Sequence, residues 1–178
     1  MILKKKPKNN SSDACRKRLY PEYKFLILVS AALALAFICS FFLVRLSRVD
    51  GESMSPTLSD GDWIFVSPIP YINDAPKRGD IIVFKRRSLT RGHIIKRVIG
   101  LPGETVEIIE GRVYINGEPI EDDFYLFNED DNFGPIVISE NSYFVLGDNR
   151  GYSIDSRYWE KSEVDSDEIF GKLVCDFN

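Results

Sequence analysis

Histidine and cysteine are scarce in this chain of 178 residues, which contains one histidine and three cysteines. Cys15 precedes a long apolar run, Cys39 lies inside it and Cys175 is close to the C-terminus. No two of these positions can easily meet, so we expect neither a disulfide framework nor a cysteine-based metal cluster. A lone cysteine near a chain end has no base beside it, which disfavours a catalytic thiol. The sequence therefore predicts no metal site and no cofactor.

Charge is absent from residues 25–44, which read FLILVSAALALAFICSFFLV. Twenty helical residues span about 30 Å, the thickness of the hydrocarbon core of a bilayer. The small-x-small tripeptide at 34–36, the candidate cleavage site of a signal peptide, lies in the middle of the run rather than after it. We therefore predict a single uncleaved transmembrane helix over residues 25–44.

Positive charge is concentrated before this run, because residues 1–24 carry eight Lys and Arg against two Asp and Glu. Arg45 and Arg48 are the only basic residues in the 30 positions that follow it. The positive-inside rule then places 1–24 in the cytoplasm and 45–178 on the extracytoplasmic side. Residues 45–178 carry 15 basic against 25 acidic residues, a balance that disfavours binding to nucleic acid. We expect a single-pass protein of the cell membrane that has lipid, but no nucleic acid, as a partner.

Helical periodicity is missing after residue 48, where short β-rich runs recur every 8–15 residues between turn signals. This pattern is typical of an all-β domain. The expected strands cover residues 62–66, 80–85, 94–99, 113–115, 119–120, 137–138, 143–146 and 169–175. Asn116-Gly117, between two of them, is a strong hairpin signal. We predict a mainly-β domain of antiparallel sheet over 45–178, with a short insert at about 105–142.

Ser53 lies in the run GESMSPTL, only nine residues after the apolar stretch. A serine held in a turn beside a membrane can act as a nucleophile on membrane-borne substrates if a base lies next to it. His93, the only histidine, would form a Ser-His-Asp triad with Asp148 or Asp155. Lys96 is the competing base. Because residues an odd number apart on a strand point to opposite faces, His93 and Lys96 should not serve the same site.

Lys96 has apolar neighbours along the chain, which favour the neutral amine. Lowering its pKa from about 10.4 to about 8 needs roughly 3.3 kcal/mol, which burial in an apolar cleft can supply. An edge-strand lysine that discourages aggregation is an equally good explanation at this point. Arg97 would lie on the other face of the strand, solvated or in a salt bridge.

Residues 147–159, GDNRGYSIDSRYW, have the density of Gly, Asn, Asp and Ser that is typical of a tight loop. Such a loop can simply cap its own backbone. This one nevertheless holds two carboxylates, two arginines and two serines within eleven residues, which suits a rigid, internally paired platform. A hydroxyl in it could hydrogen-bond the amine of Lys96 and hold it neutral and aimed.

Three segments together resemble the bacterial type I signal peptidases, which are serine–lysine proteases. SMSPTL from Ser53, KRVIGLPGE from Lys96 and GDNRGYSIDSR from Gly147 match the blocks of that family in order. The shorter RGDIIVF from Arg78 fits as well. The resemblance covers nearly all of residues 45–178 and implies an antiparallel β-sheet catalytic domain of the signal peptidase type.

The resemblance also implies the role of each site residue. Ser53 would be the nucleophile, Lys96 the general base, and the backbone N–H of Ser53 would bind the oxyanion. The supporting residues would be Ser153, which orients Lys96, the pair Asp155 and Arg157, and Asp148 with Arg150. Some members of the family have a serine two residues before the nucleophile, whereas Gly51 occupies that position here.

The implied activity is that of a membrane-anchored endopeptidase that removes signal peptides from secreted preproteins and works as a monomer. The substrate would be extended and pair with the edges at Ile94-Ile95 and at the stretch just before Ser53. Preference for an Ala-x-Ala-like site would come from shallow apolar pockets lined by Val49, Met54, Leu58 and Ile95. Met54 is equally well explained as ordinary core.

Two other functions remain open at this point. A membrane anchor could display the β-domain for protein binding, and Ser53 would then be an ordinary turn residue. A self-cleaving serine–lysine protease like the repressors of the DNA-damage response would need a DNA-binding or partner domain, and the predicted membrane span argues against it. The acidic residues 128–132 have no predicted role.

Overall fold

The structure, a computed structural model, describes residues 23–37, 45–86, 88, 90, 92–120 and 130–177. The chain divides into two compact units, Met1–Phe42 and Leu43–Asn178. In the first unit residues 23–37 form a helix. The rest of the predicted span, 38–44, lies outside the described residues. Within the part of the chain that is described, no helix is long and apolar enough to cross a membrane.

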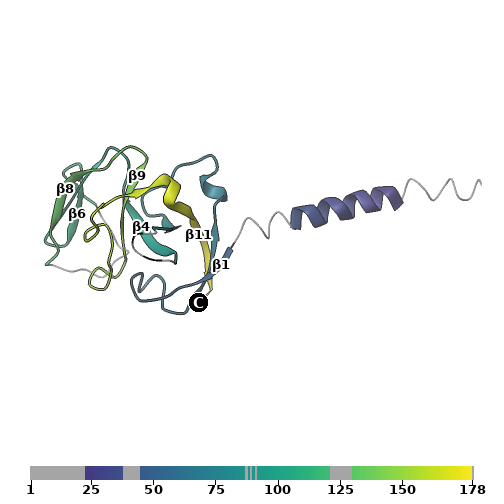
Figure 1. The fold of residues 1–178 in the computed structure, drawn as a ribbon, viewed down its shortest axis with the longest axis horizontal. Helices are drawn as coiled ribbons and strands as arrows, with labels where there is room; N and C mark the ends of the chain where they lie inside the picture. The colour runs from purple at the N-terminus through teal and green to yellow at the C-terminus, as the bar shows by residue number, and fades with distance from the viewer. Residues whose placement is uncertain are drawn as a thin grey trace, which may run out of the picture. The chain divides into compact units, whose positions relative to one another are not determined.

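A seven-stranded sheet forms the larger part of the second unit (Figure 1). Its strand order is β1-β2-β11-β3-β4-β9-β10. Every neighbouring pair in it is antiparallel. Its strands are β1 (Arg45–Arg48), β2 (Trp63–Ser67), β3 (Ile81–Phe84), β4 (Ile94–Gly100), β9 (Ser142–Leu146), β10 (Val164–Asp165) and β11 (Ile169–Phe177). Two short 3₁₀ turns, η1 (Ile69–Tyr71) and η2 (Ser166–Glu168), lie between strands. The mainly antiparallel β fold predicted from the sequence is confirmed.

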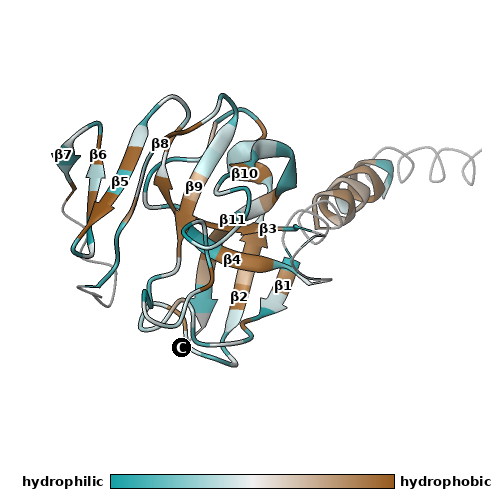
Figure 2. Cartoon of the chain, turned by 60° about the vertical axis from the view of Figure 1, so that its left-hand side comes forward, coloured by the Kyte–Doolittle hydropathy of each residue, from teal (hydrophilic) through white to brown (hydrophobic). Residues whose placement is uncertain are grey.

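A smaller four-stranded sheet, in the order β7-β6-β5-β8, lies at the opposite end of this unit from β1 (Figures 1 and 2). Its strands are β5 (Thr105–Ile109), β6 (Arg112–Ile115), β7 (Glu118–Pro119) and β8 (Phe133–Val137). The predicted hairpin is present, since β6 pairs with β7 around Asn116-Gly117. Both turn residues have positive φ, 53° and 84°, as a type I′ turn requires.

Sequence analysis missed the strands β1, β5 and β10. β5 carries a readable signal, because Val106 and Ile108 alternate with less buried residues and point into the core. β8 begins four residues earlier than predicted. Pro135 argued against a strand at this position, because a proline cannot donate a backbone hydrogen bond. It is tolerated because β8 is the edge strand of the smaller sheet.

The apolar core consists of three clusters, and one of them lies under Ser53. In that cluster Val49, Met54, Leu58, Ile64 and Val66 are buried together. Burying a side chain of this size contributes about 1.5–3 kcal/mol. The segment that carries Ser53 is therefore anchored on both sides. Figure 2 shows strand β4, which runs past this segment, as mostly hydrophobic.

Candidate active site

Ser53 lies in a tight turn that the core holds in place. The N–H of Leu58 donates to the carbonyl of Met54 at 2.9 Å, and the N–H of Ser55 donates to that of Glu52 at 3.2 Å. The side chains of Met54 and Leu58 are 1% and 0% exposed, so the turn cannot shift without opening the core. The hydroxyl of Ser53 is thereby presented at a fixed place on the surface of the domain.

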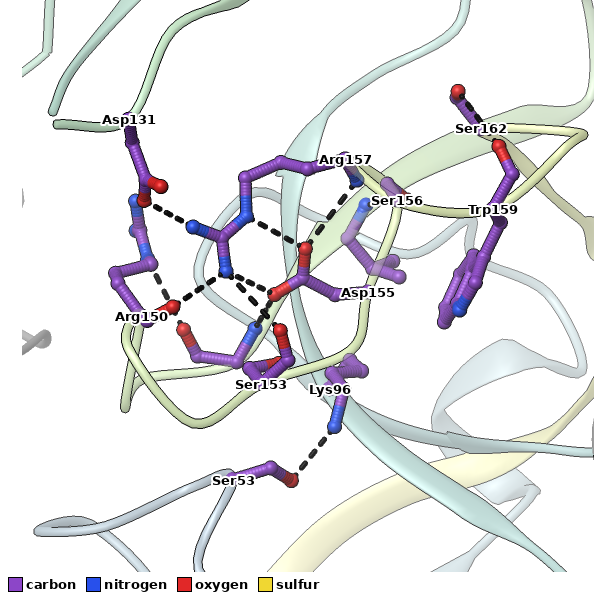
Figure 3. A network of polar contacts seen from close by, with 12 residues as sticks. Ser53, Lys96, Asp131, Arg150, Ser153, Asp155, Ser156, Arg157, Trp159 and Ser162 are labelled. Carbon is purple, nitrogen blue, oxygen red and sulfur yellow. Dashed lines mark hydrogen bonds and ion pairs between the residues drawn. The ribbon is translucent and has the colours of Figure 1, made fainter. Parts of the chain in front are cut away.

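Lys96 meets that hydroxyl from the middle of β4. Its side chain is buried, and its Nζ lies 2.7 Å from Ser53 Oγ (Figure 3). Burial lowers the pKa of the Lys96 amine from 10.5 to about 8. The carboxylates of Asp155 and Asp148 oppose this shift, whereas the guanidinium of Arg157 adds to it. A large share of these amines is therefore neutral at pH 8 and able to accept a proton.

Ser153 is buried close to this pair. Its Oγ makes no hydrogen bond within the described residues, which is unusual for a buried hydroxyl. A Cβ on Gly147 would come within 2.2 Å of that Oγ and within 2.4 Å of the Ser53 carbonyl oxygen. The loop after β9 thus packs directly against the turn of Ser53. The N–H of Asn149 also donates to the Ser53 carbonyl, at 3.1 Å.

Asp155 and Arg157 form the internal pair expected in this loop. Asp155 is fully buried, and its carboxylate accepts from the Arg157 Nε at 2.8 Å and from the Gly147 N–H at 3.0 Å. Nη2 of Arg157 donates to the carbonyls of Arg150 and Ser153, at 2.9 and 3.4 Å. The pair therefore ties together both ends of the loop that carries Ser153.

Asp148 and Arg150, grouped together by sequence analysis, serve different contacts. Asp148 forms a buried two-point ion pair with Arg97, at 2.8 and 2.6 Å, and accepts from the Thr57 hydroxyl at 2.5 Å. Arg150 Nε instead donates to the Gly147 carbonyl at 3.0 Å. The pair of Asp148 and Arg97 joins the Ser53 turn, β4 and the loop after β9, so it holds the three segments in one arrangement.

A hollow of about 430 Å³ opens beside Ser53 and Lys96. One wall comes from residues 47–50, with Met54, and the other from residues 92–95. Four of the residues predicted to contact the substrate line it: Val49, Met54, Ile94 and Ile95. Leu58 does not, because it points into the core, where it is fully buried, so the prediction for Leu58 was wrong.

His93 also lines the hollow, but its contacts do not form a triad. Its ring packs edge-to-face on Phe170, with 5.5 Å between centroids. Asp148 and Asp155, the two candidate orienting carboxylates, are bonded to arginines instead. The amine of Lys96, not the ring of His93, lies at hydrogen-bonding distance from Ser53.

Gly51 adopts a backbone conformation that other residues rarely adopt, with φ of 94°. Its N–H donates to the carboxylate of Asp60 at 2.8 Å. A serine two positions before Ser53 would therefore strain this turn, which gives a physical reason for glycine here.

No cluster of three or more His, Cys, Asp or Glu side chains that could hold a metal ion occurs in the described part of the chain. The site combines the buried amine of Lys96, the hydroxyl of Ser53 and the adjoining hollow. Such an arrangement can perform nucleophilic acyl transfer.

The sequence profile of the family described as "Signal peptidase, peptidase S26" matches residues 23–177. A signal peptidase I of Leptolyngbya laminosa is 40% identical over 157 residues, 84% of this chain and 76% of the relative. The chain belongs to the signal peptidase family. A signal peptidase I of Bacillus amyloliquefaciens is 36% identical over 168 residues, 88% of this chain and 85% of the relative. A signal peptidase I from Enterococcus faecalis V583, known from its crystal structure, is 34% identical. The match covers 57% of this chain and 98% of that chain, with a TM-score of 0.48.

Family membership makes the chain a serine endopeptidase of the signal peptidase type. Against that background, sequence analysis missed two side chains that surround the site. Thr57 lies in the same turn as Ser53, four residues further on, and its hydroxyl donates to Asp148 in the loop after β9. Its closeness to Ser53 in the sequence could have suggested this contact. Asp131, in the segment before β8, contacts Arg157, and no local pattern points to a partner 26 residues away.

Proposed function

We propose that this signal peptidase cleaves its substrates with Ser53 as nucleophile and Lys96 as general base. The observation that supports this most directly is the 2.7 Å between Lys96 Nζ and Ser53 Oγ, at the edge of an open hollow. The pKa of about 8 leaves the amine partly neutral near physiological pH, which a general base requires.

The reaction would proceed in two proton-balanced steps. Neutral Lys96 takes the hydroxyl proton of Ser53 while Oγ bonds to the carbonyl carbon of the scissile peptide. The resulting oxyanion is bound by the backbone N–H of Ser53. As the C–N bond breaks, the Lys96 ammonium gives its proton to the leaving amine. Neutral Lys96 then takes a proton from a water molecule whose oxygen bonds to the acyl carbon. The bond from that carbon to Ser53 Oγ breaks, the Lys96 ammonium returns the proton to Oγ, and the signal peptide leaves with a new carboxyl group.

Ser153 would orient the amine of Lys96. Its buried hydroxyl lacks a hydrogen-bond partner among the described residues and lies against Gly147, next to the Ser53 carbonyl. An oriented amine enters the reaction without first losing rotational freedom. Asp155 and Arg157 would keep this hydroxyl in place through the bonds within their loop.

The substrate would enter the hollow as an extended strand between residues 47–50 and 92–95. Both walls are strand edges or extend from them, so the substrate backbone can pair with them. Val49 and Met54 are buried and Ile95 is half-buried, so the part of each side chain that faces the hollow is small. Pockets between them would be shallow and would admit only small side chains. This favours an Ala-x-Ala-like site before the cleaved bond.

The apolar run 25–44 would anchor the enzyme in the cell membrane, with residues 1–24 in the cytoplasm and the catalytic domain outside. A signal peptide in the same bilayer is then presented at a raised effective concentration. The charge asymmetry on the two sides of the run supports this orientation.

The test is cleavage of a labelled preprotein in detergent by the full chain and by Ser53→Ala, Lys96→Ala and His93→Ala variants. We expect the first two to lose activity by at least about a thousandfold and His93→Ala to retain it. Wild-type turnover by Lys96→Ala, with loss in His93→Ala, would refute the serine–lysine assignment. If all three variants cleaved normally, the domain would not use this site at all.

A further inference from the structure

Asp131 lies in the acidic stretch to which the sequence assigns no role, directly before β8 of the smaller sheet. Its carbonyl accepts from the N–H of Gly111 at 2.8 Å. The side chain of Asn132 accepts from the N–H of Glu110 at 3.1 Å. These two bonds hold Asp131 against the turn between β5 and β6, so its position is set by the smaller sheet.

The carboxylate of Asp131 forms an ion pair with Nη1 of Arg157 (Figure 3). Both side chains are nearly excluded from water, at 10% and 3% exposure. Exposed ion pairs contribute little, whereas breaking a buried pair leaves an uncompensated charge in the protein interior. This contact therefore differs from the solvated pairs elsewhere on the surface.

The other edge of the same guanidinium faces the loop that carries Ser153. Nε and Nη2 donate to the carboxylate of Asp155 at 2.8 and 2.9 Å, and Nη2 also donates to the Ser153 carbonyl. Arg157 is thus bonded on one edge to the smaller sheet and on the other edge to the active-site loop. The two carboxylates together set where this cation can lie.

We infer that Asp131 is a positioning residue for the cleavage reaction, which acts through Arg157 to hold the Ser153 loop in place against Lys96. This inference rests on the proposed roles of Lys96 and Ser153. It assigns the smaller sheet a function, because the turn between β5 and β6 holds Asp131 in the position from which it contacts Arg157. The charge of Arg157 is also one of those that set the pKa of Lys96, together with Asp155 and Asp148.

Two variants of the full chain separate position from charge. Asp131→Asn keeps the shape of the side chain and removes its charge, whereas Asp131→Glu keeps the charge and displaces the carboxylate. The matched control is Asp130→Asn, which removes the same charge from an exposed neighbour. Cleavage of a labelled preprotein in detergent is followed at saturating and limiting substrate, from pH 6 to 10.

We expect both Asp131 variants to lower kcat roughly 10- to 100-fold, the effect of a small misplacement at a reacting group, with little change in KM. In Asp131→Asn the rising limb of the pH profile should also move to lower pH. The positive charge of Arg157 is then less compensated, and this charge lowers the pKa of Lys96. In Asp131→Glu and Asp130→Asn the limb should stay in place. A purely structural role would lower the yield of folded enzyme without moving this limb.

Non-additivity provides the second readout. If Asp131 acts through the loop, Asp131→Asn should cost little further kcat in a Ser153→Ala background. Wild-type kcat in both Asp131 variants, or losses that multiply with Ser153→Ala, would overturn the inference. Should Asp131→Asn fail to fold, Asp131→Glu carries the test of kcat and of non-additivity with Ser153→Ala. Failure of the serine–lysine mechanism itself would appear separately, as activity retained by Lys96→Ala.

Discussion

The dependence of cleavage on pH follows from the environment of Lys96. Burial lowers its pKa to about 8. With that value about one amine in ten is neutral at pH 7 and about nine in ten at pH 9. Since only the neutral amine accepts the proton of Ser53, kcat/KM should rise roughly tenfold between these two pH values.

A histidine base would behave differently. A base with the reference pKa of a free imidazole, about 6.5, would already be mostly neutral at pH 7, and activity would rise by less than about 1.5-fold up to pH 9. The measurement is the initial rate of preprotein cleavage in detergent at substrate well below KM. His93→Gln is the control and should leave the limb near pH 8. A limb near pH 6.5, or one that moves in His93→Gln, would refute the assignment of Lys96.

Three further outcomes can be checked on variants. A Cβ on Gly147 would overlap the Ser153 Oγ and the Ser53 carbonyl oxygen, so Gly147→Ala should lower kcat/KM at least about 100-fold. The control is Gly151→Ala, whose added Cβ meets open space and should leave kcat/KM unchanged; equal rates in the two variants would show that the packing at Gly147 is unimportant. Keeping the charged amine of Lys96 buried costs about 3 kcal/mol of stability below pH 8, and this cost falls as pH rises toward 10.5. In urea titrations Lys96→Met should therefore raise the free energy of unfolding at pH 7 and lose that gain above pH 10.5. A gain that grew with pH would contradict this reasoning. Asp148→Ala removes the buried two-point ion pair with Arg97 and should cost about 3–5 kcal/mol in thermal unfolding. A loss under about 1 kcal/mol would count against the ion pair.

Stability and activity are opposed at Lys96. The protein interior disfavours the charged form of the buried amine, which lowers its pKa and makes it a useful base. The free-energy cost of burying that charge also destabilises the fold. The surrounding ion pairs limit this cost. Asp155 and Asp148 each favour the charged form of the amine, while their own charges are compensated by Arg157 and Arg97.

The sequence by itself determined the features that depend on short-range chemistry. Short β-rich runs between turn signals predicted most strands. Asn116-Gly117 predicted the hairpin because only a few residues adopt positive φ in a two-residue turn. The alternation of side chains along a strand also predicted that Lys96 and Arg97 would lie on different faces. In the structure one of them contacts Ser53 and the other contacts Asp148.

Only the tertiary structure decided which distant side chains meet. Asp148 pairs with an arginine 51 residues away, and Arg157 with an aspartate 26 residues away, because strand register and the packing of two sheets bring them together. Local patterns hold no information about such partners. The same reason explains Leu58, whose apolar character fits a pocket wall or a core equally well until the direction of its side chain is known.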